Sequence, residues 1–177
     1  MEVCAVETTP AVGTSRLVLR SPVKTDAAEL CQLANDLSVA GNLATMPYPY
    51  RPADAEEFLD RRRDWRRSPD FAIEHKHFGF IGMVGFAENA PGRAELGCWL
   101  GRPFWGRGYA TEAVKGALKW AKYEWGRKVV WAGHFLDNRA SGEVLVKAGF
   151  LYTGEVAWRD CHARGEPVPT RMMVWLA

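Results

Sequence analysis

A glycine-punctuated segment that joins an apolar run to an amphipathic pattern constrains this chain most. The apolar run 94–100 leads into residues 102–108, Arg-Pro-Phe-Trp-Gly-Arg-Gly, and residues 110–121 then place apolar side chains at helical spacing. Gly106 and Gly108 can take positive φ and let another molecule approach the backbone closely. The following helix contributes unpaired N–H groups and the positive end of its dipole. The sequence therefore predicts a strand, a turn and a helix that bind a phosphate group.

Length and composition indicate one compact domain. The 177 residues are 47% apolar and 12% aromatic, which suffices for a hydrophobic core and argues against disorder. A net charge of +2, from 23 basic and 21 acidic residues that are largely interspersed, is too small to indicate a nucleic-acid partner. Four cysteines without Cys-x-x-Cys spacing predict neither a zinc site nor a disulfide framework. With no leader pattern and no apolar run of membrane length, we expect a cytoplasmic protein.

Seven strands and four helices are expected in one domain over residues 14–177, behind a loose tail over residues 1–13. The strands are expected at residues 16–20, 71–76, 78–88, 94–100, 127–134, 150–158 and 171–176. The helices are expected at residues 27–37, 52–66, 110–121 and 138–148. Short turns between the second, third and fourth strands predict an antiparallel meander. The fold class is therefore α/β in the mixed α+β sense.

Two common phosphate-binding motifs do not fit this turn. A P-loop ends in Gly-Lys-Ser/Thr, whereas Gly106 is followed by Arg-Gly-Tyr-Ala. A Rossmann fingerprint needs a third glycine or alanine where Thr111 stands, and a sheet of alternating strands and helices. The expected meander argues against such a sheet. A pyrophosphate cradle for coenzyme A is the third interpretation.

Three blocks of sequence together resemble the GNAT acetyltransferase superfamily. They are Gly-Arg-Gly-Tyr-Ala-Thr-Glu-Ala at 106–113, Asp-Asn-Arg-Ala-Ser at 137–141 and Lys-Ala-Gly-Phe at 147–150. Their spacing, with the runs 94–100 and 16–20, is similar to the RimJ/RimL-type branch of ribosomal-protein-alanine N-acetyltransferase-like proteins. The resemblance covers the whole expected domain. It implies the GNAT fold, in which helices flank a central mixed and mainly antiparallel sheet.

The resemblance also implies acetyl-CoA as the cosubstrate and direct transfer of its acetyl group to a primary amine. The pyrophosphate is then expected on the turn and the helix start, at Gly106, Arg107, Gly108, Tyr109, Ala110 and Thr111. The backbone of Trp99 and Leu100 is expected to pair with the pantetheine arm, and Gly97 to permit the close approach. Pro103 departs from the superfamily pattern, which usually has Gln or Arg there. The cradle relies chiefly on backbone N–H groups, so the departure is compatible with coenzyme A.

Asn138 and Ser141 open the last expected helix. By resemblance, Asn138 bonds the pantetheine arm and Ser141 reaches the CoA sulfur as the proton donor to the leaving thiolate. Their residue types also suit an N-cap and a first helical turn. The two roles are compatible.

Glu95 is the candidate general base. The attacking amine must be neutral, and the superfamily often has an acid on this strand. Glu95 alternates with Gly97 and Trp99 on one strand face, where it can face the reaction centre. The alternative is a structural carboxylate that pairs with a neighbouring arginine. The sequence leaves both roles of Glu95 open.

Several other cysteine and histidine side chains are interpreted as structural. Cys98 alternates away from Glu95 and is expected to be a packed core thiol. His75, His77 and the pair 161–162 lack the spacing of a metal site, so no metal is predicted.

The acceptor amine is left open. The expected partners are acetyl-CoA and an amine, with no nucleic acid and no membrane, in a monomer or homodimer. A protein or peptide N-terminus is favoured by the branch resemblance, and the alternatives are a small amine (antibiotic, amino acid or polyamine) or a catalytically silent acyl-CoA-binding protein. Loops 41–52 and 159–170 are expected to set specificity, with His134 and residues 158–160 as possible pocket residues. The basic run 61–67 is expected to be a solvated helix face, and a nucleic-acid-binding helix is the alternative.

Overall fold

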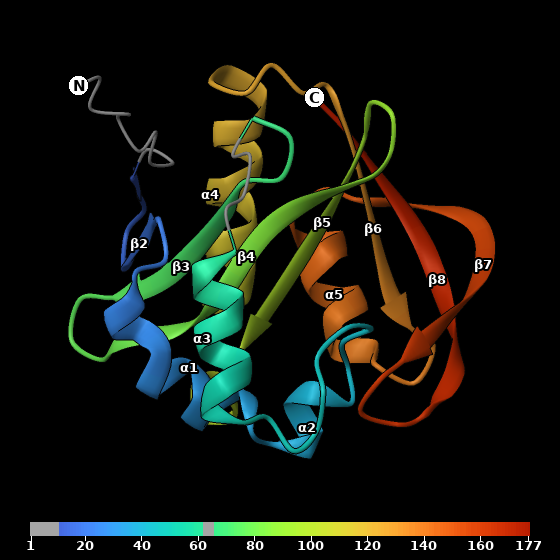
Figure 1. Ribbon diagram of the computed structural model, residues 1–177. Coiled ribbons are helices and arrows are strands. Elements are labelled where there is room, and N and C mark those ends of the chain that lie inside the picture. Colours follow the sequence, from blue (N-terminus) through green and yellow to red (C-terminus); the bar gives the residue numbers. More distant parts are fainter. Residues whose placement is uncertain (1–10, 62–65) are drawn as a thin grey trace, which may run out of the picture.

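Eight strands form one open mixed sheet at the centre of the computed structural model, which describes residues 11–61 and 66–177 (Figure 1). They are β1 (Val12–Gly13), β2 (Leu17–Arg20), β3 (Asp70–His75), β4 (Gly79–Ala90), β5 (Arg93–Leu100), β6 (Val129–Phe135), β7 (Leu151–Cys161) and β8 (Glu166–Leu176). Their order across the sheet is β1-β2-β3-β4-β5-β6-β8-β7. Among the described strands, β5 and β6 form the parallel pair and the other neighbours run antiparallel. The mixed, mainly antiparallel sheet and its β3–β4–β5 meander are therefore confirmed.

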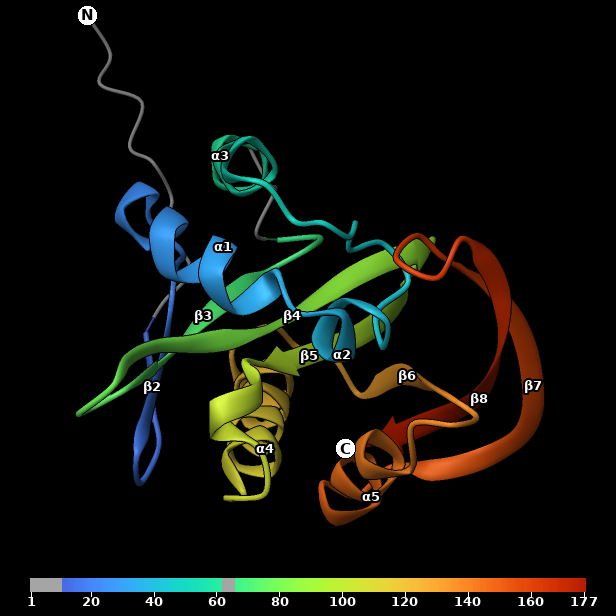
Figure 2. The same ribbon diagram turned by 90° about the horizontal axis from the view of Figure 1, so that it is seen from below.

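Helices cover both faces of this sheet (Figure 2). The α-helices are α1 (Ala27–Ala34), α2 (Leu37–Ala40), α3 (Pro52–Asp60), α4 (Tyr109–Tyr123) and α5 (Arg139–Lys147), and two 3-10 turns are η1 (Lys24–Asp26) and η2 (Arg102–Phe104). One face carries α1 and α3, and the opposite face carries α4 and α5. Along β5, Leu96 and Leu100 join the core under α4, while Trp99 packs against the core under α1. This alternation is the period of two that the sequence pattern predicts.

The ends of two N-terminal elements differ from the predictions. The predicted helix 27–37 is two helices, because Asn35 leaves the helical conformation after α1 and its side chain accepts the Tyr50 amide (3.0 Å). Residues 12–13, expected in the tail, pair with β2 as β1. A two-residue strand is too short to show a periodic pattern, so the sequence could not reveal it.

The last hairpin is longer than predicted. From Val156 to Cys161, β7 pairs with β8 without a break, so most of the predicted loop 159–170 is strand. β7 is an edge strand whose residues are mostly exposed on both faces, and it therefore lacks the alternation that marks a half-buried strand.

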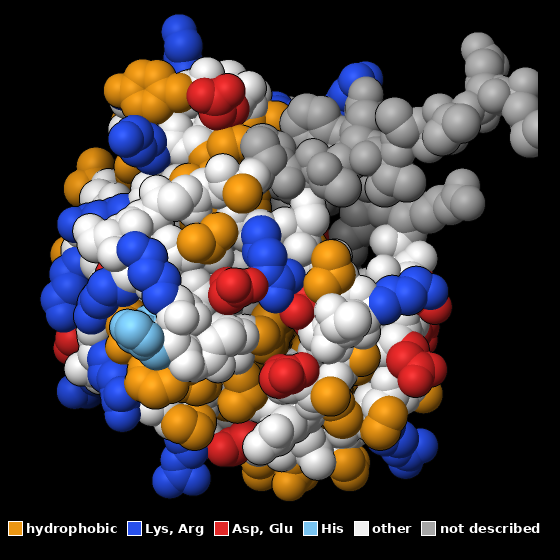
Figure 3. Space-filling view, turned by 90° about the vertical axis from the view of Figure 1, so that its left-hand side faces the viewer, with side chains coloured by type: hydrophobic (Ala, Val, Ile, Leu, Met, Phe, Trp, Pro, Cys, Tyr) orange, Lys and Arg blue, Asp and Glu red, His pale blue; other side chains and the backbone are white. Residues whose placement is uncertain are grey.

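Charged side chains of both signs are spread over the surface. On the face at the left of Figure 1, Asp and Glu side chains lie among Lys and Arg (Figure 3). Helix α3 ends at Asp60 rather than near residue 66, and residues 62–65 of the basic run lie outside the described part of the chain. At the start of that run, Arg61 pairs with Glu57 (2.7 Å), as expected of a solvated helix face. None of the described helices has the length and apolar character needed to cross a membrane.

Candidate active site

The parallel pair of strands β5 and β6 opens toward its carboxyl end. Among the described residues, the two strands pair only at Glu95–Trp131 and Leu96–Ala132. Beyond these positions β5 stays paired with β4 and β6 with β8, so the two strands separate (Figure 1). A Cβ on Gly97 would meet no atom within 4 Å, so this glycine does not serve to make room for a neighbouring side chain. The opening, called the splay here, exposes a strand edge whose N–H and C=O groups can bind another molecule.

A cavity of about 440 Å³ lies beside the splay on the face that carries α1 and α3. We call it the α3-side cavity. Loop residues 42–47, helix α3 and strands β4 to β7 contribute to its wall. Its charged lining residues are Asp54, Glu57, Arg61, Asp70, Glu95 and Arg159, and its larger apolar ones include Met46, Tyr50, Phe58, Met83, Trp99 and Phe135. The predicted loop 41–52 and two residues of the predicted loop 159–170, Arg159 and Thr170, therefore reach the same cavity.

Glu95 lies on the wall of this cavity and is paired. Its side chain is buried, and both carboxylate oxygens accept hydrogen bonds from the Arg159 guanidinium, with Nη2 to Oε2 at 2.9 Å. Asn89 Nδ2 donates a third hydrogen bond to Oε2 (2.8 Å). These bonds raise the pKa of Arg159 above its usual value, against the opposing effect of burial. The structure thus shows the arginine pairing of the structural alternative and also places Glu95 at the splay.

The glycine turn has the predicted backbone conformation. Gly106 and Gly108 have φ of +70° and +79°, and α4 begins directly after Gly108. The first hydrogen bond of α4 runs from Glu112 N to Gly108 O (3.1 Å), so the N–H groups before Glu112 precede the helical ladder. Pro103 lies in the first turn of η2, where a missing N–H is tolerated. The turn therefore presents a backbone anion site despite Pro103.

The turn is braced by the start of the sheet, which the sequence did not indicate. Glu112 Oε1 accepts hydrogen bonds from the Thr14 hydroxyl and the Arg16 amide, both at 2.7 Å. Arg16 Nε donates to Oε2 (2.7 Å), and Arg16 Nη1 donates to the carbonyl oxygen of Arg107 (3.1 Å). Glu112 stands in the first turn of α4, the position in which an acid ordinarily stabilises a helix, so the sequence held no signal of this longer-range role.

We expect Glu112→Gln to lower both thermal stability and acetyl-CoA affinity, because it weakens the tie to Arg16. Burial opposes ionisation of Glu112, but the hydrogen bonds from Arg16 and Thr14 outweigh it and hold the pKa of Glu112 below its usual value. A lowered pKa in the folded state gives stability that is complete above the unfolded-state pKa and is lost as pH falls through the folded-state pKa. Melting curves of both proteins from pH 7 to pH 3 should therefore converge at the acid end. A constant difference across that range would contradict the assignment.

Asn138 and Ser141 occupy the start of α5. Asn138 is the N-cap, and its Oδ1 accepts the Ser141 amide (3.1 Å), so the predicted capping role is confirmed. The Asn138 Nδ2 group keeps two donors. Among the described residues, the Ser141 hydroxyl makes no hydrogen bond, and Ser141 is not part of the α3-side cavity. Its helix and Glu95 therefore lie on opposite faces of the sheet, on either side of the splay.

Cys98 has the environment of a packed thiol. Its side chain packs against the core under α4, on the strand face opposite to Glu95. Burial raises the pKa of the Cys98 thiol to about 12. The thiolate that a nucleophile requires is therefore scarce at neutral pH.

We expect Cys98 to resist alkylation and to be dispensable. At pH 8 a thiol with this pKa is thiolate in only about one molecule in 10⁴, so iodoacetamide should modify Cys98 far more slowly than a peptide cysteine. Peptide mass spectrometry measures the modification, and Cys98→Ala should retain acetyl transfer. Rapid modification of Cys98, or loss of transfer in Cys98→Ala, would contradict the structural role.

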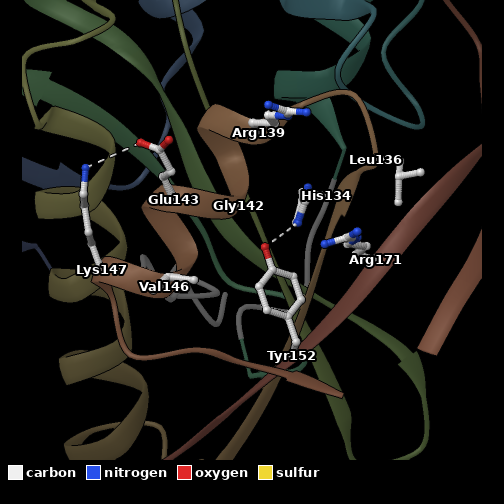
Figure 4. Close-up of a pocket in the computed structure, with 9 residues that line it drawn as sticks. All are labelled: His134, Leu136, Arg139, Gly142, Glu143, Val146, Lys147, Tyr152 and Arg171. Carbon is white, nitrogen blue, oxygen red and sulfur yellow. Dashed lines mark hydrogen bonds and ion pairs between the residues drawn. The ribbon is translucent and has the colours of Figure 1, made fainter. Parts of the chain in front are cut away.

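His134 points away from the α3-side cavity and lines a second one, of about 630 Å³, beside α5 (Figure 4). Its Nδ1 lies 2.9 Å from the Phe135 carbonyl oxygen and its Nε2 lies 3.1 Å from the Tyr152 hydroxyl. Arg171 lies on the same side of this cavity, and Glu143 and Lys147 lie on the side of α4. His134 therefore does not line the α3-side cavity, and alternation along β6 turns Phe135 toward that cavity instead.

His75 and Cys161 have hydrogen-bond partners of their own. His75 Nδ1 accepts the His77 amide (3.1 Å), and the His75 ring stacks on Phe78 (centroids 4.6 Å apart). Cys161 donates to the Leu43 carbonyl oxygen (3.3 Å). Within residues 11–61 and 66–177, no three His, Cys, Asp or Glu side chains gather as a metal site would require.

A helix-capped glycine turn, a splayed parallel pair and a cavity at the splay define an acyltransferase-type site. The chain belongs to the GNAT acetyltransferase domain family, whose model matches residues 16–151. The family that the sequence blocks resemble is therefore confirmed. An uncharacterized N-acetyltransferase, p20 of Bacillus licheniformis, is 34% identical over 108 residues, which are 58% of this chain and 60% of that protein. The match thus spans less than two thirds of that relative. YoaA of Bacillus subtilis (strain 168), also an uncharacterized N-acetyltransferase, is 26% identical over 92% of this chain and 94% of its own length.

Solved structures share the fold at low identity. A GNAT-family acetyltransferase from Bacillus anthracis has a TM-score of 0.82 at 18% identity and covers 94% of this chain and 98% of its own. RimL, a ribosomal alpha-N-protein acetyltransferase in complex with coenzyme A, has a TM-score of 0.81 at 17% identity with the same coverage of both chains. A spermidine N-acetyltransferase from Vibrio cholerae in complex with CoA and spermine has 0.78 at 19% identity, over 92% and 96%. These similarities show the fold. The acceptors named for these proteins differ, since RimL is a ribosomal-protein acetyltransferase and the Vibrio cholerae enzyme acts on spermidine.

Proposed function

We propose that this protein transfers the acetyl group of acetyl-CoA to a primary amine that enters through the α3-side cavity. The splay is the observation that carries the proposal, because it brings an unpaired strand edge, Glu95 and the cavity to one point. The glycine turn before α4 supplies an anion site on the opposite side of the sheet. This arrangement lets cofactor and acceptor approach the splay from opposite faces.

The residues around the splay fit acetyl-CoA. The positive φ values of Gly106 and Gly108 leave the helix-start amides free for a pyrophosphate, with Arg107 adding charge. The edge of β5 that is unpaired with β6 beyond Leu96 leaves room for a pantetheine arm along Trp99 and Leu100. Asn138 and Ser141 would contact the arm and the sulfur from α5. Acetyl-CoA supplies the thioester that is attacked.

The reaction requires a proton to leave nitrogen and a thiolate to leave carbon. A C–N bond forms and the C–S bond breaks, and unpaired N–H groups of β5 stabilise the intermediate oxyanion. Glu95 accepts the proton from nitrogen, and the Ser141 hydroxyl donates to the departing sulfur. The carboxylate takes the ammonium proton of the tetrahedral adduct after the amine has attacked. The acceptor amine must then arrive neutral.

Two classes of acceptor have support. A protein or peptide N-terminus is the first, because the RimJ/RimL-type blocks are present and the fold is shared with RimL. A cationic small amine such as a polyamine is the second, because Asp54, Glu57 and Asp70 line the cavity and would attract positive charge.

Calorimetry with acetyl-CoA followed by a CoA-release assay tests the function. The acceptor panel comprises N-terminal peptides, amino acids, polyamines and aminoglycosides. We expect acetyl-CoA to bind below millimolar concentration and one acceptor class to release CoA. Absence of binding near 1 mM, a concentration equivalent to only about 4 kcal/mol of binding free energy, would refute the proposal. Binding without release by any acceptor would favour a silent acyl-CoA-binding protein.

A further inference from the structure

Glu95 is held by two residues that lie outside the motif blocks. Arg159 Nη1 donates to Oε1 and Nη2 to Oε2, which is the two-pronged geometry of an arginine–carboxylate pair. Asn89 Nδ2 donates to Oε2 from the other side. Glu95 is 8% exposed, so few water molecules compete for these bonds. We call these donors the Glu95 cradle.

The cradle leaves the carboxylate one open position. A carboxylate offers about four acceptor positions, two on each oxygen. Arg159 occupies one on each oxygen and Asn89 occupies the second on Oε2. The remaining position is on Oε1 of Glu95, a residue that lines the α3-side cavity. A nitrogen in that cavity can therefore hydrogen-bond to Oε1 without displacing Arg159 or Asn89.

The backbone is shaped to supply Asn89. The register between β4 and β5 shifts between Glu88, opposite Ala94, and Ala90, opposite Arg93, so Asn89 is an additional residue in β4. Such a bulge redirects a side chain relative to the regular strand. Here the redirected amide reaches Glu95, six positions along the chain.

Arg159 reaches Glu95 across the sheet. It lies on β7, which is an edge strand, and β8 and β6 separate that strand from β5. Opposite residues of an antiparallel pair share a face, and Ala157 opposes Thr170, which lines the α3-side cavity. Arg159 lies two residues further on the same face, where Nη2 also lies 3.7 Å from the Met172 sulfur. The hairpin β7–β8 thus contributes a cation to a carboxylate 64 residues earlier in the chain.

We propose that Arg159, assisted by Asn89, is a positioning residue for acetyl transfer: it holds the Glu95 carboxylate in place, with the open position of Oε1 directed to the acceptor nitrogen. Arg159 itself does not bind the acceptor. This inference rests on the proposed role of Glu95.

A double-mutant cycle tests the positioning role in the full-length protein. Arg159→Met should lower kcat on the order of 10- to 100-fold and change the acceptor KM less than about twofold, because the base loses alignment while the acceptor contacts remain. In a Glu95→Gln background, the same substitution should change kcat less than about twofold. Arg159→Lys should restore part of kcat, since an ammonium replaces only one prong of the guanidinium. A comparable loss of kcat or a large rise in KM in the Glu95→Gln background would overturn the proposal, because Arg159 would then act on the acceptor directly.

Arg171→Met is the matched control. Arg171 lies in the same hairpin but on the other sheet face, where its guanidinium carbon lies 5.8 Å from the centroid of the Tyr152 ring. Its replacement should leave kcat unchanged. A fall in kcat equal to that of Arg159→Met would show a general requirement for hairpin charge and would overturn the specific role.

A second measurement needs no acceptor. Crystal structures of the wild type and Arg159→Met should show the Glu95 carboxylate displaced or in several rotamers only in the variant, with acetyl-CoA affinity unchanged. A Glu95 side chain that keeps its position without Arg159 would overturn the positioning role. This measurement reports the position of the Glu95 side chain and needs no acetylated acceptor. A failure to acetylate any acceptor would contradict the proposed function alone.

Discussion

Glu95→Gln is expected to lower kcat by on the order of 10²- to 10⁴-fold, the usual contribution of a general base. Glutamine has nearly the same shape and can still accept a hydrogen bond from Asn89, but it cannot take the proton that leaves the acceptor nitrogen. Acetyl-CoA should bind within about twofold of wild type, since the cofactor contacts that we propose lie on the turn, on β5 and on α5. CoA release measures kcat, and calorimetry measures the affinity.

Glu166→Gln is the control for this substitution. Glu166 is an exposed carboxylate at the start of β8 and does not line the α3-side cavity, so its replacement removes the same charge without touching the site. It should leave kcat unchanged. Unchanged turnover in Glu95→Gln would mean that Glu95 is a structural partner of Arg159 only.

Gly108→Val is expected to weaken acetyl-CoA binding by about tenfold or more. Gly108 has φ of +79° at the N-cap of α4, a conformation that a β-branched residue adopts only under strain. Strain of this kind is about 1–3 kcal/mol, and about 1.4 kcal/mol corresponds to a factor of ten in affinity. The strained turn relaxes in the free protein, so binding must restore the conformation that presents the helix-start amides. Calorimetry with acetyl-CoA measures the loss.

Gly126→Val is the matched control for the turn. Gly126 has φ of +71° beyond the other end of α4, and a Cβ there would meet no atom within 4 Å. Both variants should lose thermal stability by a similar amount, whereas only Gly108→Val should lose acetyl-CoA affinity. Equal affinity in the two variants would place the pyrophosphate elsewhere.

The elements with strong periodicity could be predicted from the sequence. Helix α4 has a wide apolar stripe, and Ala113, Val114 and Ala117 are all fully buried, so its place against the sheet follows from local pattern. The end of β7 could not be predicted, because Arg159 and Asp160 are two consecutive charged residues and do not continue an alternating apolar pattern. Pairing with β8 decides that segment instead.

The same distinction holds for the site. Gly106 and Gly108 indicate the turn in the sequence, because few other residues adopt positive φ. Glu95 can be named as a candidate site residue from its position on the strand before that turn. Arg16 was not predicted as a site residue, and Arg159 was predicted only as a possible pocket residue, not as the partner of Glu95. Their partners Glu112 and Glu95 lie 96 and 64 residues away along the chain, and no local pattern encodes a contact over such a separation.

By itself, the sequence determined the family, the class of fold and the glycine turn, because these depend on local φ preferences, hydrophobic periodicity and ordered motif blocks. Only the tertiary structure decided where β5 and β6 separate, which loops line the α3-side cavity, and that Glu95 is bound by Arg159 and Asn89. Strand pairing and ion pairing join residues distant in sequence, and their energies arise only when the sheet has formed. The turn before α4 is therefore visible in the sequence, while the paired Glu95 at the splay is a product of the fold.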